Sequence, residues 1–168
     1  RLQVEHGITE SVTGVDLVEW MVKLAGGEAI AYHFAESGCS IEVRLCAEDP
    51  AIDFQPSSGL VPEVRFPDDI RVDHWTTTGS EISTYYDSLL GKLITVAPTR
   101  EEAIAAMNDA LSATEIAGIE TNLEYLRHGV ASEVFSEPGK MSTGVLADFV
   151  YTPQTIEVLA SGTQTTVQ

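Results

Sequence analysis

Apolar and polar side chains alternate along several short stretches of the chain, which predicts strands. In RLQVEH at residues 1–6 every second residue is polar, and one face of the expected strand carries Arg1, Gln3 and Glu5. This strand would place a guanidinium, an amide and a carboxylate side by side. We expect the following GITESVTG to connect it to a helix.

A second alternating stretch, SIEVRLC, runs from Ser40 to Cys46. Its apolar residues face one side, and Glu42 and Arg44 share the other. Further strand patterns occur in LVPEVRF, IRVDHW and KLITVA, whereas EDPAIDFQPSSG has the Asp, Pro, Ser and Gly content of a loop. The sequence therefore predicts a second strand face on which a carboxylate and a guanidinium lie together.

Helical periodicity predicts three helices. Leu17, Met21 and Leu24 recur at the spacing of one helix face, and a glycine pair ends that helix. Residues 99–113 begin with a capping box and carry apolar residues at helical spacing. A shorter helix is expected to start near Asn122.

Strands interspersed with helices, without regular βαβ alternation, indicate an α+β fold with a largely antiparallel sheet and flanking helices. A chain of 168 residues is long enough for about one domain with one sizeable core. From Tyr151 onward the sequence is rich in Thr and weakly patterned. We therefore expect one domain at residues 1–150 and a tail at residues 151–168.

The charge balance narrows the choice of partners. Nine Lys and Arg residues against 26 Asp and Glu give a net charge of −17, and such a field repels nucleic acid and anionic membranes. No apolar run approaches the roughly 18 residues of a membrane helix, and no signal segment is recognisable. We expect a soluble, cytoplasmic protein without nucleic-acid or membrane partners, whose few arginines hold any anionic substrate.

Several kinds of site lack support in the sequence. Cys39 and Cys46 would lie about 23 Å apart on one strand, too far for a disulfide, so we expect reduced thiols. The four histidines have no metal-ligand spacing, and we expect no metal site. The chain contains no GxGxxG, GxxxxGK[ST] or GxSxG motif, which disfavours a phosphate-cradling loop and a serine hydrolase.

The polar faces with Arg1, Gln3 and Glu5, and with Glu42 and Arg44, admit two interpretations. Alternating polar residues usually form the solvated outer face of a sheet. Alternatively, a guanidinium holds an oxyanion through its bidentate fork, and a neighbouring carboxylate removes a proton from it. The pattern alone does not choose between these interpretations.

A resemblance to a known family favours the second. RLQVEHGITE followed by VTGVDLVEWMVKLAGGE resembles the biotin carboxylase pattern RxQVEHPVTE…VTGxDLVxxQ. The similarity continues in order through IEVRLCAEDP, FQPSSG, IRVD, YYDSLLGKLI, TREEAIAAM and GIETNLEYL, and spans residues 1–135. It implies the fold of the biotin carboxylase C-terminal domain of the ATP-grasp superfamily.

Members of this family use ATP to activate bicarbonate as carboxyphosphate and then carboxylate biotin. By resemblance, Arg1 would grip bicarbonate, and Gln3 and the main chain of Val4 would also contact it. Glu5 would be the base that deprotonates bicarbonate. Arg44 would stabilise the biotin enolate and carboxyphosphate, because a fixed guanidinium suits a developing anion. The catalytic residues would thus be Glu5, Arg44 and Arg1.

Three further residues match family positions. Asp87 falls in a loop near the biotin site, Ile119 where the adenine of ATP packs, and Arg71 at the homodimer contact. A purely structural role is the alternative for each. The resemblance also implies that the Mg²⁺ ligands would precede Arg1 and that biotin would be carried on another domain.

The variant VEHGITE and the tail YTPQTIEVLASGTQTTVQ resemble urea carboxylases. Most family members have Pro where this chain has Gly7, so the turn after the first strand would be looser. Residues 151–168 would be a linker and the first strand toward a carboxyltransferase domain, and urea would be carboxylated to allophanate. An acyl-CoA or pyruvate carboxylase is the alternative within the family.

Because the matching sequence starts at the RxQVEH motif, the resemblance implies the C-terminal part of a biotin carboxylase, which would not turn over ATP alone. Its partners would be the N-terminal and ATP-grasp lobes, the biotin carrier and carboxyltransferase domains, and a second copy in a homodimer. The alternative from another class is a scaffold that builds the dimer and docks neighbouring domains.

Overall fold

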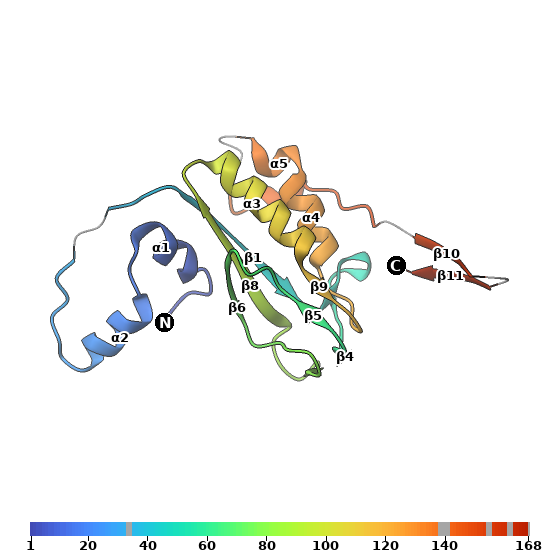
Figure 1. Ribbon diagram of the computed structural model, residues 1–168, viewed down its shortest axis with the longest axis horizontal. Coiled ribbons are helices and arrows are strands. Elements are labelled where there is room, and N and C mark those ends of the chain that lie inside the picture. Colours follow the sequence, from blue (N-terminus) through green and yellow to red (C-terminus); the bar gives the residue numbers. More distant parts are fainter. Residues whose placement is uncertain (33–34, 138–141, 154–155, 161–162, 168) are drawn as a thin grey trace.

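A three-stranded antiparallel sheet forms the centre of the computed structural model, which describes residues 1–32, 35–137, 142–153, 156–160 and 163–167. Its strand order is β1 (Cys39–Cys46), β8 (Leu89–Ala97) and β6 (Arg71–His74). β8 lies in the middle and pairs on both sides (Figure 1). The predicted α+β class, with a largely antiparallel sheet, is confirmed, as are these three strands.

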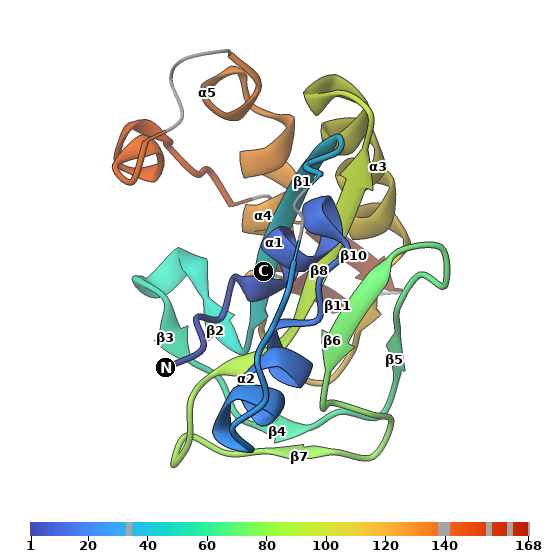
Figure 2. The same cartoon turned by 90° about the vertical axis from the view of Figure 1, so that its left-hand side faces the viewer.

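Helices cover both faces of this sheet (Figures 1 and 2). α3 (Arg100–Ala113) and α4 (Leu123–Ala131) pack on one face, and α1 (His6–Thr13) packs on the other. α2 (Leu17–Ala25) follows α1, and the short α5 (Glu133–Ser136) follows α4. The three predicted helices therefore correspond to α2, α3 and α4.

The capping box at the start of α3 is confirmed. The Thr99 hydroxyl accepts from the Glu102 backbone N–H, and the Glu102 carboxylate accepts from the Thr99 N–H, both at 3.2 Å. These two bonds satisfy backbone donors that a helix start leaves without partners. The start of α3 is thus fixed by the four consecutive residues 99–102.

The remaining strands are short pairs around the central sheet. β2 (Glu48–Asp49) pairs with β3 (Gln55–Pro56), and β4 (Gly59–Leu60) pairs with β7 (Glu81–Ile82). β5 (Val64–Arg65) pairs with β9 (Glu115–Ile116). The expected strand LVPEVRF is divided between β4 and β5, because Pro62 has no N–H to donate to a ladder.

Two single-turn 3₁₀ helices and a hairpin complete the described elements. The 3₁₀ helices are η1 (Pro50–Ile52), inside the expected loop, and η2 (Val145–Asp148). In the tail, β10 (Ile156–Ala160) pairs antiparallel with β11 (Thr163–Val167). Parts of the expected linker and strand at residues 151–168, namely 154–155, 161–162 and 168, lie outside the described residues.

The expected strand at residues 1–6 is wrong. Residues 1–3 are irregular, residues 4–5 form a turn, and α1 begins at His6. The backbone N–H groups of His6 and Ile8 donate to the carbonyls of Gln3 and Glu5, which starts a helix. A strand needs a neighbour for its own N–H and C=O groups, and no described strand pairs with this segment.

The helix α1 replaces the connection expected at GITESVTG. Gly, Thr, Ile and Val are weak helix formers, and a helix of eight residues is marginal without packing. Gly7 is buried, and a Cβ at this position would lie 2.3 Å from Ile94 Cδ1 on β8. The close approach of α1 to the sheet stabilises a helix that its sequence does not favour.

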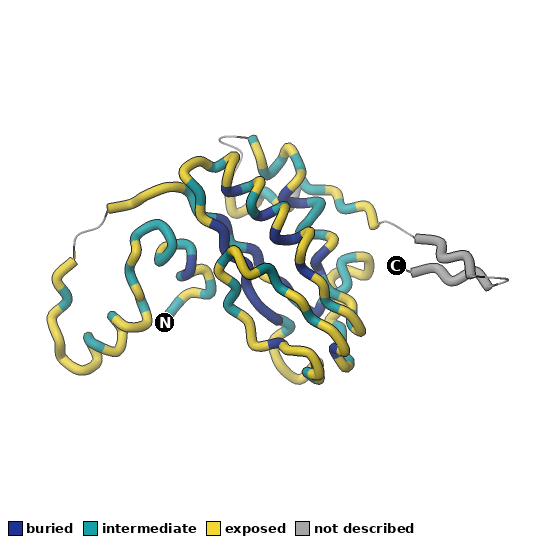
Figure 3. Tube along the Cα trace, viewed as in Figure 1, coloured by how far each residue is buried: buried dark blue, intermediate teal, exposed yellow. Residues whose placement is uncertain are grey.

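The main core lies between the sheet and α3 and α4, where buried positions follow β1 and β8 (Figure 3). Its buried side chains are Ile41, Val43, Leu45, Leu93, Ala103, Met107, Ala110, Leu111, Leu123 and Val130. A smaller cluster contains Ala47, Val61, Ile82 and Leu90. No helix in the described ranges has the length and apolar character needed to cross a membrane.

Leu93 on β8 is fully buried in this core, so replacing it with Ala is expected to destabilise the fold. The loss should be about 3 kcal/mol, from lost burial and the cavity that remains. Val96→Ala on the same strand is the matched control, since Val96 is 52% exposed and should cost less than about 1 kcal/mol. Urea unfolding of both variants measures the difference, and equal losses would contradict the position of the core.

Candidate active site

The side chains of Glu5 and Arg44 form an ion pair, although 39 residues separate them in sequence. Arg44 Nη2 donates to Glu5 Oε2 at 2.9 Å. Arg44 projects from β1, and Glu5 lies in the turn before α1, which packs against β1. The side chains are 51% and 48% exposed, so both charges are accessible to a small anion.

A pocket of about 890 Å³ opens beside Arg44. Val4, Arg44 and Asp87, three of the residues predicted from the family resemblance, line it together. The other lining residues are Cys46, Glu48, Trp75, Glu81, Ile82, Ser83, Tyr86, Ser88 and Leu89. A largely apolar wall with a few polar groups is typical of a site for a small organic molecule.

Asp87 helps to shape the loop at the edge of this pocket. Its Oδ1 accepts from the Leu89 backbone N–H at 2.9 Å, and so holds the entry into β8. Ser88 Oγ donates to Glu48 Oε1 at 2.5 Å, which joins the same loop to β2. Asp87 therefore has a structural contact as well as a position on the pocket wall.

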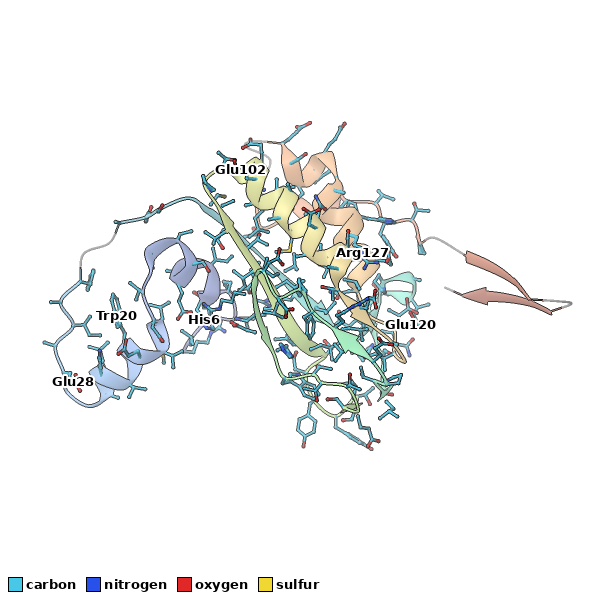
Figure 4. All side chains as sticks on the ribbon, in the orientation of Figure 1. His6, Trp20, Glu28, Glu102, Glu120 and Arg127 are labelled. Carbon is cyan, nitrogen blue, oxygen red and sulfur yellow. The ribbon has the colours of Figure 1, made fainter. Side chains whose placement is uncertain are left out.

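None of the three residues of the predicted strand face, Arg1, Gln3 and Glu5, is among the residues that line this pocket, and all three are exposed. The Gln3 carbonyl accepts from the backbone N–H of His6 at 3.2 Å and from His6 Nδ1 at 2.7 Å. Figure 4 shows His6 where the start of α1 approaches the sheet. The turn at residues 3–6 thus directs Glu5 toward Arg44.

Ile119 and Arg71 lie away from the Glu5–Arg44 pair. Ile119 is half-buried against the smaller core cluster and lines a second, separate pocket of about 330 Å³. Arg71 on β6 donates to Glu10 at 2.7 Å and to Asp73 at 2.9 and 3.0 Å. The structure therefore brings together Val4, Glu5, Arg44 and Asp87, but neither Ile119 nor Arg71.

Sequence reasoning missed Lys92, which lies beneath the turn that carries Glu5. Its ammonium donates to the Val4 carbonyl at 2.8 Å, and its side chain is only 8% exposed. A lone lysine inside the apolar run LLGKLITVA was the available signal, because lysine is almost never buried without a partner.

Glu42 also belongs to this buried group. Its side chain is 3% exposed, and its Oε2 lies 3.8 Å from Lys92 Nζ. Burial raises the pKa of Glu42, while the charges of Lys92 and Arg44 act to lower it. The predicted polar face of β1 is therefore covered at Glu42 and accessible at Arg44.

Neither cysteine indicates disulfide or thiolate chemistry. Cys39 and Cys46 are both free. Burial, followed by the negative charge of Glu48, raises the pKa of Cys46 to about 11. Cys46 therefore contributes to the pocket wall as a neutral thiol.

The described residues include no group of three His, Cys, Asp or Glu side chains that could hold a metal ion. One of the four histidines, His33, lies outside the described residues. The described part of the chain thus offers no cage for Mg²⁺. The Glu5–Arg44 pair and its pocket contain instead the groups that handle an anion and an organic ligand.

Comparison with known proteins gives two family matches. Residues 42–148 match the biotin carboxylase C-terminal domain, and residues 1–33 match the ATP-binding domain of the carbamoyl-phosphate synthase L chain. Urea amidolyase from Lachancea kluyveri is 47% identical over all of this chain, which spans 9% of that protein's length.

Solved structures agree with this match. The urea carboxylase of Kluyveromyces lactis superimposes with a TM-score of 0.89 at 45% identity, over 95% of this chain and 14% of that one. The biotin carboxylase domain dimer of Hydrogenobacter thermophilus 2-oxoglutarate carboxylase, in complex with ADP, MgADP and bicarbonate, gives 0.83 at 41% identity, over 88% of this chain and 33% of that one. These matches confirm the resemblance drawn from the motifs: the chain belongs to the biotin carboxylase C-terminal domain family.

Proposed function

We propose that this chain forms the bicarbonate and biotin side of an ATP-dependent biotin carboxylase active site. The observation that carries the proposal is the Glu5–Arg44 pair, 2.9 Å apart, in which Arg44 also lines a pocket together with Val4 and Asp87. An exposed guanidinium beside a carboxylate binds a small anion and can remove its proton.

In this proposal the residues divide the work on bicarbonate. Arg1, with Gln3 and the Val4 main chain, holds the anion, and Glu5 accepts the proton from its hydroxyl group. Arg44 then stabilises negative charge that develops on the acceptor, because a fixed guanidinium needs no reorganisation during the reaction. Because the net charge of the chain is −17, its electrostatic field repels an anion such as bicarbonate. Binding of the anion therefore depends on these arginines.

ATP, Mg²⁺ and biotin are the proposed cofactors. Biotin, when bound, supplies the ureido nitrogen that accepts the carboxyl group, and the pocket with Arg44, Asp87 and an apolar wall suits such a ring. Ile119 would contact the adenine from its separate pocket. We assign the Mg²⁺ ligands to the partner lobes, as the family resemblance implies.

We further propose urea as the final carboxyl acceptor. The urea amidolyase match covers the whole chain, including the tail at residues 151–168, whereas the 2-oxoglutarate carboxylase match covers 88% of it. The tail would lead toward a carboxyltransferase domain, and the domain would occupy residues 1–150. The enzyme would then act in urea degradation.

The partners proposed for this chain are the remaining lobes of the carboxylase, its biotin carrier and carboxyltransferase domains, and a second copy. α2 supports the first of these, because its Met21, Val22 and Leu24 are 47%, 68% and 59% exposed and none of its residues is buried (Figure 3). α2 also lies within the segment that matches an ATP-binding domain. Its apolar face is a surface for the rest of that domain to cover.

A homodimer and a cytoplasmic location complete the proposal. The related 2-oxoglutarate carboxylase domain is a dimer, and Arg71 lies on the edge strand β6, where a second copy could approach. The two free cysteines suit a reducing compartment such as the cytoplasm.

A chimera tests the catalytic proposal. In urea amidolyase from Lachancea kluyveri, the segment that aligns with this chain is replaced by this chain. We expect the chimera to release ADP in a bicarbonate-dependent manner, because the Glu5–Arg44 pair would complete the active site. A coupled assay for ADP measures the rate, with the unmodified relative as the reference.

Each outcome of this experiment is informative. A folded chimera that binds ATP but releases no bicarbonate-dependent ADP would overturn the catalytic proposal and favour the scaffold interpretation. The response of this rate to urea reports the carboxyltransferase domain of the relative, so the choice of acceptor is tested separately, as urea-dependent ADP release by the full-length enzyme that contains this chain; no response to urea there would contradict urea as the acceptor and leave the biotin carboxylase step intact.

A further inference from the structure

Three groups from three different elements surround the ammonium of Lys92. The Val4 carbonyl, in the turn before α1, accepts its hydrogen bond at 2.8 Å. Asp73 Oδ2 on β6 lies 3.3 Å away, and Glu42 Oε2 on β1 lies 3.8 Å away. Lys92 itself projects from the central strand β8, so this cluster joins the whole sheet to the turn.

This arrangement is a costly way to stabilise a core. Lys92 and Glu42 are 8% and 3% exposed at their side chains, so both charges have lost most of their water. Glu42 Oε2 is buried without a hydrogen-bond partner among the described residues. A buried ion pair is often no more stabilising than apolar side chains of the same size. The cluster therefore calls for a role besides stability.

The hydrogen bond to Val4 indicates what that role is. A peptide group is planar, so the bond that fixes the Val4 carbonyl also orients the Glu5 N–H and Cα. On the other side of the turn, the Gln3 and Glu5 carbonyls accept from His6 and Ile8 in α1. Lys92 thus links β8 to the peptide group that precedes Glu5, the residue whose carboxylate accepts from Arg44.

We propose that Lys92 is a positioning residue, which holds the Val4–Glu5 turn over Arg44, and that Glu42 is its buried counter-charge. The proposal rests on the proposed function only for the role of Glu5 as base. Glu42 and Arg44 lie two residues apart on the same face of β1. This face of β1 therefore presents a buried carboxylate to Lys92 and an exposed guanidinium to Glu5.

A pair of variants separates positioning from stability. Lys92→Met removes the donor to Val4 but leaves Glu42 buried beside one fewer cation, so it also destabilises the fold. The double variant Lys92→Met with Glu42→Gln removes that charge and still lacks the donor. The comparison that decides is the double variant against Glu42→Gln alone, with Arg65→Met as a control that removes a surface cation elsewhere.

The first readout uses the chain itself and does not depend on its function. Amide hydrogen exchange reports how firmly each backbone group is held. In the double variant, protection of the His6 and Ile8 amides, which donate to the Gln3 and Glu5 carbonyls, should fall about tenfold relative to Glu42→Gln, while core amides such as Leu111 stay protected. Equal protection of the turn in the two variants would overturn the proposal.

The second readout uses the chimera described above. Misplacing a reacting group by about 1 Å costs up to roughly 10²-fold in rate. We expect kcat of the double variant to fall about tenfold below that of Glu42→Gln, with an unchanged KM for ATP. A double variant with the turnover of Glu42→Gln would show that Lys92 serves stability alone. If the unmodified chimera is inactive, the proposed function fails, and the exchange experiment decides on Lys92.

Discussion

Replacing Glu5 with Gln in the chimera is expected to lower bicarbonate-dependent ADP release by about 10²-fold or more. Glutamine has nearly the same shape but cannot accept the proton of bicarbonate. It also removes the negative charge that lies 2.9 Å from Arg44. The fold should be unaffected, because an ion pair that is about half exposed contributes at most about 1 kcal/mol.

The control for this prediction is Glu133→Gln. Glu133 is an exposed glutamate on α5, outside the lining of the pocket beside Arg44, and its replacement makes the same chemical change. Thermal unfolding and ADP release are measured for both variants. If Glu5→Gln keeps the rate of Glu133→Gln, the carboxylate is not the base, and the chain acts as a scaffold.

Replacing Arg44 with Met should reduce carboxylation by about 10²-fold or more, because it removes the guanidinium that stabilises the developing anion. Methionine keeps an unbranched chain over the same part of the pocket wall. Lys at this position keeps the charge but lacks the bidentate fork. We therefore expect Arg44→Lys to retain more activity than Arg44→Met and less than Arg44 itself.

Glu5→Gln and Arg44→Met should lower the rate of ADP release at different steps of the reaction. Glu5 acts on bicarbonate, so Glu5→Gln should slow ADP release equally with biotinylated and unbiotinylated chimera. Arg44 also acts on biotin, the acceptor, so Arg44→Met should lower the rate of ADP release more in the biotinylated chimera than in the unbiotinylated one. Arg65→Met, which removes an exposed arginine paired with Glu115, is the matched control. Equal losses for Arg44→Met in the two forms would limit Arg44 to bicarbonate binding.

Local sequence signals were sufficient for much of the fold. The Thr99–Glu102 capping box set the start of α3, and alternation of apolar residues identified β1, β6 and β8. These signals depend on neighbours within a few residues, so one sequence contains them. α1 escaped prediction, because its eight residues are weak helix formers held by packing against Ile94 and the sheet.

For α2, the sequence predicted the helix but not what its apolar face contacts. The spacing of Leu17, Met21 and Leu24 predicted an amphipathic helix, and the helix is present. An apolar stripe usually faces a core, yet Leu24 is 59% exposed. What covers a helix face depends on the surrounding chain, which periodicity does not contain.

By itself, the sequence determined the α+β class, the three central strands, the three longer helices and the residue types of the candidate site. Only the tertiary structure decided that Glu5 meets Arg44 and that Lys92 is buried beneath Val4. Residue types and periodicity are local properties of the chain. The contacts of a charged side chain depend on which distant elements pack together, and the side chain is buried only where they supply its counter-charge.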